Sequence, residues 1–206
     1  MKTVSLVALF AIALASGASD AQDLEPCDAQ ALVGYDAAVD AIIDKTVGSA
    51  ASLSVTTIPS FKPESGLRLV GPSVYFVQFQ TSLWDQGIRH DGEAIEEVEF
   101  SSLPIRARAR SAAIAPALAK RIEAVYAKAI AAARASERGG MDGETVRFSI
   151  PGIGCGSIWS PEPGTRGAQL VELQQQLARH VHLSTDDDQP RSEEMIAHLV
   201  QALEDR

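Results

Sequence analysis

Cysteine and histidine are the most chemically versatile side chains of this chain, which has two cysteines and four histidines among its 206 residues. A thiolate beside a histidine can act as a nucleophile, and both residue types can hold zinc. Cys155 lies in the glycine-rich run IPGIGCGSIW (150–159). The run leaves three alternatives for Cys155: a nucleophile, a metal ligand or half of a disulfide.

A disulfide between Cys27 and Cys155 fits this pattern best. An exported chain with two cysteines usually pairs them. Gly154 and Gly156, which flank Cys155, would let a second chain segment approach closely. Isolated cysteines lack the paired spacing of zinc sites, and nothing in the sequence assigns a histidine partner to a thiolate. We predict the disulfide and keep a reactive or ligating Cys155 as the alternative.

His180 and His182 are a second candidate, for a metal site. They lie near the end of an expected helix and are followed by the acidic residues 186–188. Two imidazoles and a carboxylate could hold zinc, but residues two apart on a continuous helix do not face the same way. Histidines are also favoured near a helix C-terminus by the helix dipole. We therefore expect no bound metal and no cofactor.

Arg106, Arg108 and Arg110, in the run IRARAR, form a basic cluster in an acidic protein. Such a cluster is a candidate interaction face for a carboxylate-rich protein or an anionic small molecule. The commoner outcome for such a run is a solvated segment that offsets the chain's own acidic residues.

Asp36, Asp40 and Asp44 recur every four residues in an expected helix. A stripe of carboxylates could bind a hard cation. Like charges at this spacing repel each other mildly, and a solvated helix face is the common outcome. We predict the solvated face.

The sequence contains no assembled catalytic motif. His90 and Asp91 lie at the tip of a predicted hairpin and could supply part of a Ser/His/Asp site. The chain has no G-x-S-x-G sequence, however, which is the motif that presents the nucleophile in many hydrolases. It also lacks a P-loop and a dinucleotide-binding fingerprint.

The N-terminal sequence indicates the compartment in which the protein works. Lys2, an apolar run and then small residues have the layout of a secretory signal peptide over residues 1–21. Cleavage would fall before Gln22 or, alternatively, before Ala18. The apolar run is shorter than the ~20 residues that span a bilayer. We expect a periplasmic or extracellular protein with no transmembrane segment once the signal is removed.

The formal net charge of −9 argues against two classes of partner. An acidic chain is repelled by the phosphates of nucleic acids and by anionic lipid surfaces.

Periodicity predicts an α+β fold for residues 22–206, as a single domain. We expect a mostly antiparallel sheet of about four to six strands, packed by an N-terminal helix, a long central helix and two C-terminal helices. The central helix is expected to start near Pro116. Ser160 or Thr165 would cap the third helix, and Ser192 the last one. The expected ranges are strands at 52–58, 67–70, 73–80 and 144–150, a hairpin within 88–100, and helices at 28–47, 116–138, 167–181 and 192–203.

The first functional hypothesis is a non-catalytic binding or accessory protein, with the three arginines as a candidate interaction face. The alternative is an exported hydrolase or metal-dependent enzyme that uses Cys155 or the pair His180 and His182. The sequence alone names no ligand, partner or reaction.

Overall fold

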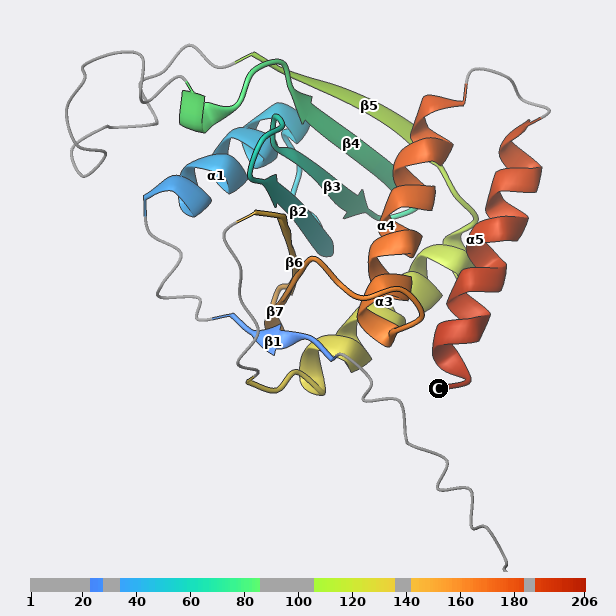
Figure 1. Cartoon of the computed structure of the whole chain (residues 1–206). Coiled ribbons are helices and arrows are strands. Elements are labelled where there is room, and N and C mark those ends of the chain that lie inside the picture. The colour runs from blue at the N-terminus through green and yellow to red at the C-terminus, as the bar shows by residue number, and fades with distance from the viewer. Residues whose placement is uncertain (1–22, 28–33, 86–105, 136–141, 184–187) are drawn as a thin grey trace, which may run out of the picture.

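Seven antiparallel strands form one sheet with helices on both faces (Figure 1), so the predicted α+β class is confirmed. The computed structural model describes residues 23–27, 34–85, 106–135, 142–183 and 188–206. The strand order is β1-β7-β6-β2-β3-β4-β5. The strands are β1 (Glu25–Pro26), β2 (Leu53–Pro59), β3 (Ser65–Val70), β4 (Ser73–Phe79), β5 (Ala107–Ala113), β6 (Glu144–Ile150) and β7 (Gly154–Trp159).

The sheet is larger than predicted, partly because the glycine-rich run around Cys155 is a strand and not a loop. Gly154–Trp159 forms β7, which pairs with β6 on one side and β1 on the other. Gly156 is needed for this packing, since a Cβ atom there would lie 3.0 Å from Leu24 Cδ1. The run therefore does admit a second chain segment, which is β1.

The helices divide between the two faces of the sheet. One face carries α1 (Tyr35–Val47), and the other carries α3 (Pro116–Ala131) and α4 (Arg166–His182). The last helix, α5 (Asp188–Glu204), packs against α3 and α4. No helix in the described part of the chain is long and apolar enough to cross a membrane.

The observed helix starts confirm some of the predicted starts and caps and contradict others. Pro116 begins α3, as predicted. Thr165 caps α4 by accepting a hydrogen bond from the Ala168 N–H at 3.2 Å, so Ser160, the other candidate, is not the cap. The prediction that Ser192 caps the last helix is wrong, because α5 begins at Asp188. Asp188 places a negative charge at the positive end of the helix dipole.

The main core lies between the sheet and the helices α3, α4 and α5. Alternate residues of the central strands point into it, as the two-residue period of a strand requires. Tyr126 stacks on Phe148 at a centroid distance of 5.1 Å, and its hydroxyl donates to the Leu170 carbonyl at 2.9 Å. A smaller cluster lies under α1 and contains Val39, Ile43, Val77, Phe79 and Leu83.

Several predicted features lie outside the described residues. They are the signal peptide at 1–21, the start of the predicted first helix at 28–33, and the predicted hairpin with His90 and Asp91. Asp186 and Asp187 also lie outside them.

Candidate functional site

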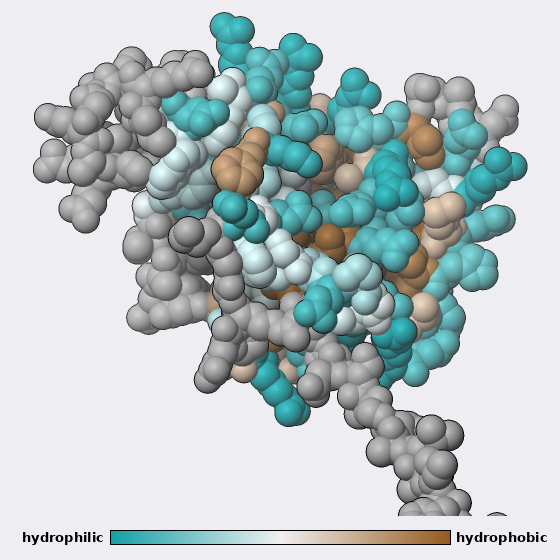
Figure 2. Space-filling view, viewed as in Figure 1, coloured by the Kyte–Doolittle hydropathy of each residue, from teal (hydrophilic) through white to brown (hydrophobic). Residues whose placement is uncertain are grey.

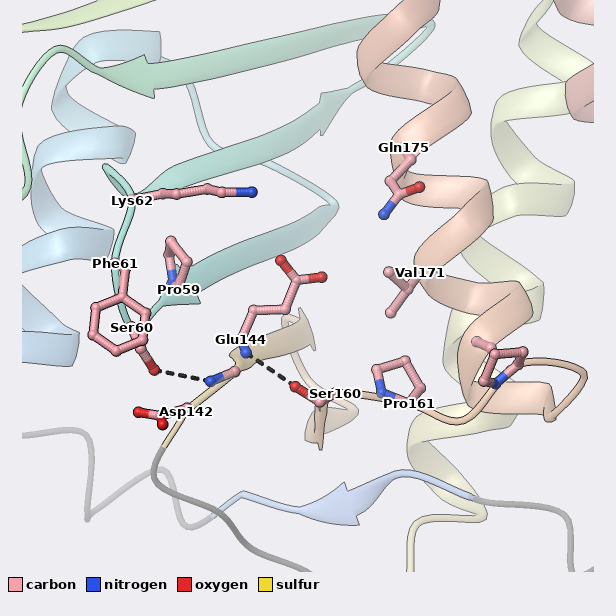
Figure 3. A pocket seen from close by; sticks show the side chains of 13 residues that line it. Pro59, Ser60, Phe61, Lys62, Asp142, Glu144, Ser160, Pro161, Val171 and Gln175 are labelled. Atoms are coloured by element: carbon pink, nitrogen blue, oxygen red, sulfur yellow. Dashed lines mark hydrogen bonds between the residues drawn. The ribbon is translucent and has the colours of Figure 1, made fainter.

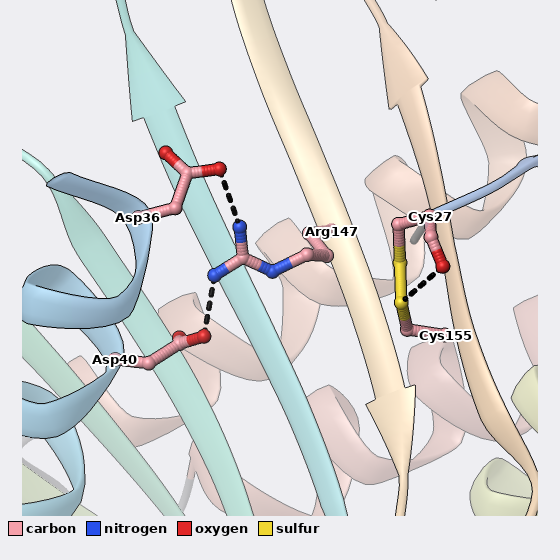
Figure 4. The surroundings of a disulfide bond; sticks show 5 residues. All are labelled: Cys27, Asp36, Asp40, Arg147 and Cys155. Carbon is pink, nitrogen blue, oxygen red and sulfur yellow. Dashed lines mark hydrogen bonds and ion pairs between the residues drawn. A yellow bond between two sulfur atoms is a disulfide. The ribbon is translucent and has the colours of Figure 1, made fainter. Parts of the chain in front are cut away.

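Cys27 and Cys155 are joined by a disulfide, with Cα atoms 5.5 Å apart (Figure 4). This is the pairing that the sequence favoured. Both cysteines are half-buried at the outer edge of the sheet, where β1 meets β7. Because its sulfur is bonded to Cys27, Cys155 has no thiolate to offer as a nucleophile or a metal ligand in this structure.

His180 and His182 have separate packing environments. His180 is fully buried, and its Nε2 lies 3.0 Å from the Ala113 carbonyl oxygen. A carbonyl only accepts, so Nε2 carries the hydrogen. His182 packs edge-on against Phe76 with ring centroids 5.4 Å apart. The described residues contain no group of three or more His, Cys, Asp or Glu side chains that could hold a metal ion.

The aspartates of α1 keep 28–60% of their side-chain surface exposed, as predicted, but the prediction missed that they also pair with buried arginines. Asp40 and Asp44 bind Arg68 at 3.0 and 2.6 Å. Asp36 binds Arg147 at 3.0 Å, and Asp40 binds Arg147 as well (Figure 4). Arg68 and Arg147 are only 1% and 5% exposed. Two buried guanidinium groups need carboxylate partners, and the stripe supplies them.

Arg106, Arg108 and Arg110 lie at and along β5, the last strand in the sheet order. All three are exposed, and their spacing of two puts them on one face of the strand. With its amide oxygen turned toward Arg108, Gln80 accepts hydrogen bonds from Nε at 2.7 Å and Nη2 at 3.0 Å. The three exposed arginines thus lie together on one face of β5, as their spacing of two residues requires.

The most exposed large apolar side chain in the described part of the molecule is Phe61, at 82%. It belongs to the loop between β2 and β3 and lies between two hollows. Figure 2 shows this side of the molecule hollowed near its centre, with apolar atoms within the hollow and hydrophilic atoms around it. The two hollows share five lining residues: Pro59, Ser60, Phe61, Lys62 and Asp142.

The first hollow, of about 610 Å³, separates the Phe61 loop from α4 and is called the Phe61 cleft here. Its apolar wall includes Pro59, Pro161 and Val171. Lys62 and Glu144 point into it from the sheet side, and Gln175 and Val171 face them from α4 (Figure 3).

The charged groups of the Phe61 cleft form no ion pair with any residue that the structure describes. No carboxylate of the described residues lies within 4.0 Å of the Lys62 ammonium group. No lysine, arginine or histidine of the described residues pairs with Asp142 or Glu144. The cleft therefore offers an apolar wall with two carboxylates and one ammonium group at its rim.

The second hollow, of about 660 Å³, is lined by Tyr35, Ser82 and Trp84 and is called the Trp84 hollow here. Trp84 is 44% exposed and meets Tyr35 edge-on at 5.7 Å. Behind this wall lies Glu64, which is fully buried.

Glu64 holds the wall of the Trp84 hollow in place. Its carboxylate accepts hydrogen bonds from the Tyr35 hydroxyl, from the Ser82 hydroxyl at 2.8 Å and from the Leu83 N–H at 3.0 Å. Burial, and then the hydrogen bond to Glu64, raise the pKa of Tyr35 well above its ordinary value. Tyr35 therefore stays protonated as the donor to Glu64.

Two serines fix the loops around the Phe61 cleft to the start of β6 (Figure 3). Ser60 accepts from the Gly143 N–H at 3.1 Å, and Ser160 accepts from the Glu144 N–H at 3.1 Å. Ser160 has φ = 36°, which is an uncommon backbone conformation for any residue but glycine. The cleft is thus formed by hydrogen-bonded loops before any ligand arrives.

Sequence reasoning missed this cleft, although one signal for it exists. Phe61 stands in PSFKP, where Pro59 and Pro63 restrict the backbone on both sides. A proline-flanked aromatic residue between two strands is a candidate for a fixed, exposed contact. Glu144 and Asp142 carry no comparable signal, because only the pairing of β2 with β6 brings them to this loop.

No protein-family model matches the chain. No curated protein and no solved structure is significantly similar to it either.

Proposed function

We propose that this is an exported, non-catalytic binding protein that holds a partner protein at the Phe61 cleft. The observation that carries the proposal is the exposure of Phe61, 82%, on a loop fixed by two prolines and by the Ser60 contacts to β6. Aromatic residues are enriched at the centres of protein interfaces.

The energetics favour this use of Phe61. Burying a phenylalanine side chain contributes roughly 1.5–3 kcal/mol relative to leaving it exposed. A fixed loop loses little conformational entropy when it binds, so more of this free energy remains as affinity.

Two observations support export. A disulfide is usual in oxidising compartments and rare in the cytosol, and Cys27 is bonded to Cys155. The N-terminal sequence has the layout of a signal peptide.

The enzymatic alternative receives less support from the geometry. It would use Cys155 or the pair His180 and His182. Cys155 is in a disulfide, His180 is buried against a backbone carbonyl, and His182 packs on Phe76. Each of these groups has a structural role that accounts for its position.

Affinity capture from the exported fraction of the source cells, after chemical cross-linking, tests the proposal. Phe61→Ser should abolish recovery of a specific cross-linked partner. Ile153→Ser is the matched control, because Ile153 is also an exposed apolar residue, at 51%, but lies at the opposite end of β6. Thermal unfolding should show both variants folded. Equal recovery with wild type and Phe61→Ser would refute the proposal, as would the absence of any partner.

A further inference from the structure

The sheet ends differently at its two edges. At one edge β1 is two residues long and is covalently attached to its neighbour through Cys27. At the other edge β5 is seven residues long and pairs with β4 along its whole length without a bulge. In the described part of the chain no strand pairs with the outer side of β5, which lies along the upper rim of the molecule in Figure 1.

The hydrogen-bond pattern shows which backbone groups of β5 point outward. The Gln80 N–H donates to the Arg106 carbonyl at 3.0 Å, and the Ile114 N–H donates to the Pro72 carbonyl at 2.8 Å. Antiparallel strands alternate between residues that bond the neighbour and residues that point away from it. The even-numbered residues of β5 therefore bond β4, and the odd-numbered ones present N–H and C=O groups to the outside.

Small side chains leave this outer edge accessible. The outward-facing residues are Ala107, Ala109, Ser111 and Ala113. Among the described residues, the one hydrogen bond to their outward groups is that of His180 Nε2 with the Ala113 carbonyl. Exposed edge strands are usually protected by charged side chains, proline, a bulge or a short length. The run from Ala107 to Ser111 has the charges of Arg108 and Arg110 but none of the other three.

The arginines determine what this edge can accept. Arg106, Arg108 and Arg110 lie on one face of the strand, so an added strand with acidic residues at alternate positions would place carboxylates opposite them. A second copy of β5 in a continuous antiparallel sheet would bring arginine against arginine, which is unfavourable. Electrostatics thus favour an acidic partner over self-association.

We propose that the outer edge of β5 binds an acidic, extended segment of a partner protein, which adds to the sheet as a further strand. Main-chain hydrogen bonds at Ala107, Ala109 and Ser111 supply affinity, and the three arginines select the acidic sequence. This proposal is independent of the Phe61 cleft, which lies in other loops.

A labelled peptide, acetyl-Thr-Glu-Val-Glu-Val-Glu-Thr-amide, tests this directly by fluorescence anisotropy with the full mature chain. Ala109→Pro removes an outward N–H but no bond to β4, and should weaken binding at least tenfold. Ala109→Ser keeps the N–H and should bind like wild type.

The double variant Arg108→Glu, Arg110→Glu should also weaken binding at least tenfold. Arg134→Glu with Arg191→Glu, which makes the same charge change at exposed sites outside β5, should not weaken binding.

Three outcomes would overturn the proposal. The first is no binding of the peptide to the wild-type chain. The second is equal binding of the same peptide with lysine in place of glutamate. The third is loss of binding in the arginine variant but not in Ala109→Pro, which would leave electrostatic attraction without strand addition. Circular dichroism must show each variant folded, and sedimentation of the wild type detects a second copy at this edge.

Discussion

The two faces of the sheet are stabilised by different forces. Toward α3, α4 and α5 the contacts are apolar, and Phe148, Leu67 and Val55 are fully buried there. Toward α1 the centre of the face is ionic, with Arg68 and Arg147 bonded to three aspartates. The disulfide is on the ionic side as well, since Cys155 pairs with Ser149, which lies two residues from Arg147.

The difference shows how each face fixes its helices. Apolar packing depends on shape and tolerates replacement by residues of similar volume. An ion-pair network depends on charge balance, and removing one member leaves a partner with no counter-charge. The position of α1 is therefore specified by a few residues, whereas α3 and α4 are positioned by many.

The largest effect is expected from Arg68→Met. This substitution removes the cation partner of Asp44 and one of the two cation partners of Asp40. It also removes the hydrogen bonds from Arg68 Nη1 to the Val55 and Leu67 carbonyls. We expect the free energy of unfolding to fall by about 3–5 kcal/mol, measured by urea denaturation.

A compensated variant sharpens this prediction. Adding Asp44→Asn to Arg68→Met should recover part of the loss, because Asp44 then has no cation partner among the described residues, whereas Asp40 keeps Arg147. Phe148→Ala on the other face should cost a similar amount, about 3–5 kcal/mol, but leaves a cavity that no change of charge repairs. A double variant no more stable than Arg68→Met would show that lost packing, and not charge, dominates at Arg68.

Removal of the disulfide is expected to be the next largest effect. Cys27→Ser with Cys155→Ser should lower the free energy of unfolding by about 2–5 kcal/mol. The Arg134 N–H bonds the Leu24 carbonyl at 2.7 Å, so its hydrogen exchange should speed up as β1 detaches. Reductant should reproduce both effects in the wild type and change nothing in the serine variant.

Tyr35→Phe removes one hydrogen-bond donor from the buried Glu64 carboxylate. A hydrogen bond to a charged group contributes about 1.5–3 kcal/mol, and the variant should lose about this much at pH 8. The pKa of folded Tyr35 is raised above the ordinary value of about 10. The contribution of its hydroxyl is therefore complete below pH 10 and lost as pH rises above it. Urea titrations from pH 8 to 11 should show the two proteins converging; a constant difference would contradict this.

Glu204→Gln should have the smallest effect, since the pair with Arg121 is on the surface. The hydrogen bond from Arg121 lowers the pKa of Glu204. Its contribution is therefore present above the ordinary carboxyl pKa and is lost as pH falls through the lowered value. Thermal unfolding should show a small difference from wild type at pH 7 and none at strongly acidic pH.

The apolar face was largely predictable from the sequence. The spacing of Leu170, Leu173 and Leu177 predicts α4, and Pro116 predicts the start of α3. The β2, β3, β4 and β6 ranges were predicted to within two residues. These elements follow from local periodicity, which needs no knowledge of the partner surface.

The ionic face and the cleft depend on contacts between distant segments. Asp36 meets Arg147 only because α1 crosses the sheet at that point, and the two are 111 residues apart in the chain. A carboxylate stripe has the same sequence pattern whether water or arginine faces it. The strand around Cys155 was missed because glycine is depleted in strands, and here close packing against Leu24 requires it.

The separation of Cys27 and Cys155 by 128 residues also has a consequence for biosynthesis. A ribosome makes Cys27 long before its partner, so the growing chain carries a single thiol for most of its synthesis. With only two cysteines in the chain, no incorrect bridge within one molecule exists. An incorrect disulfide must instead join Cys27 or Cys155 to another molecule, and it would have to be exchanged before the native bridge could form. Formation of the correct disulfide therefore depends on when Cys27 is oxidised, since Cys155 is the only other cysteine in the chain.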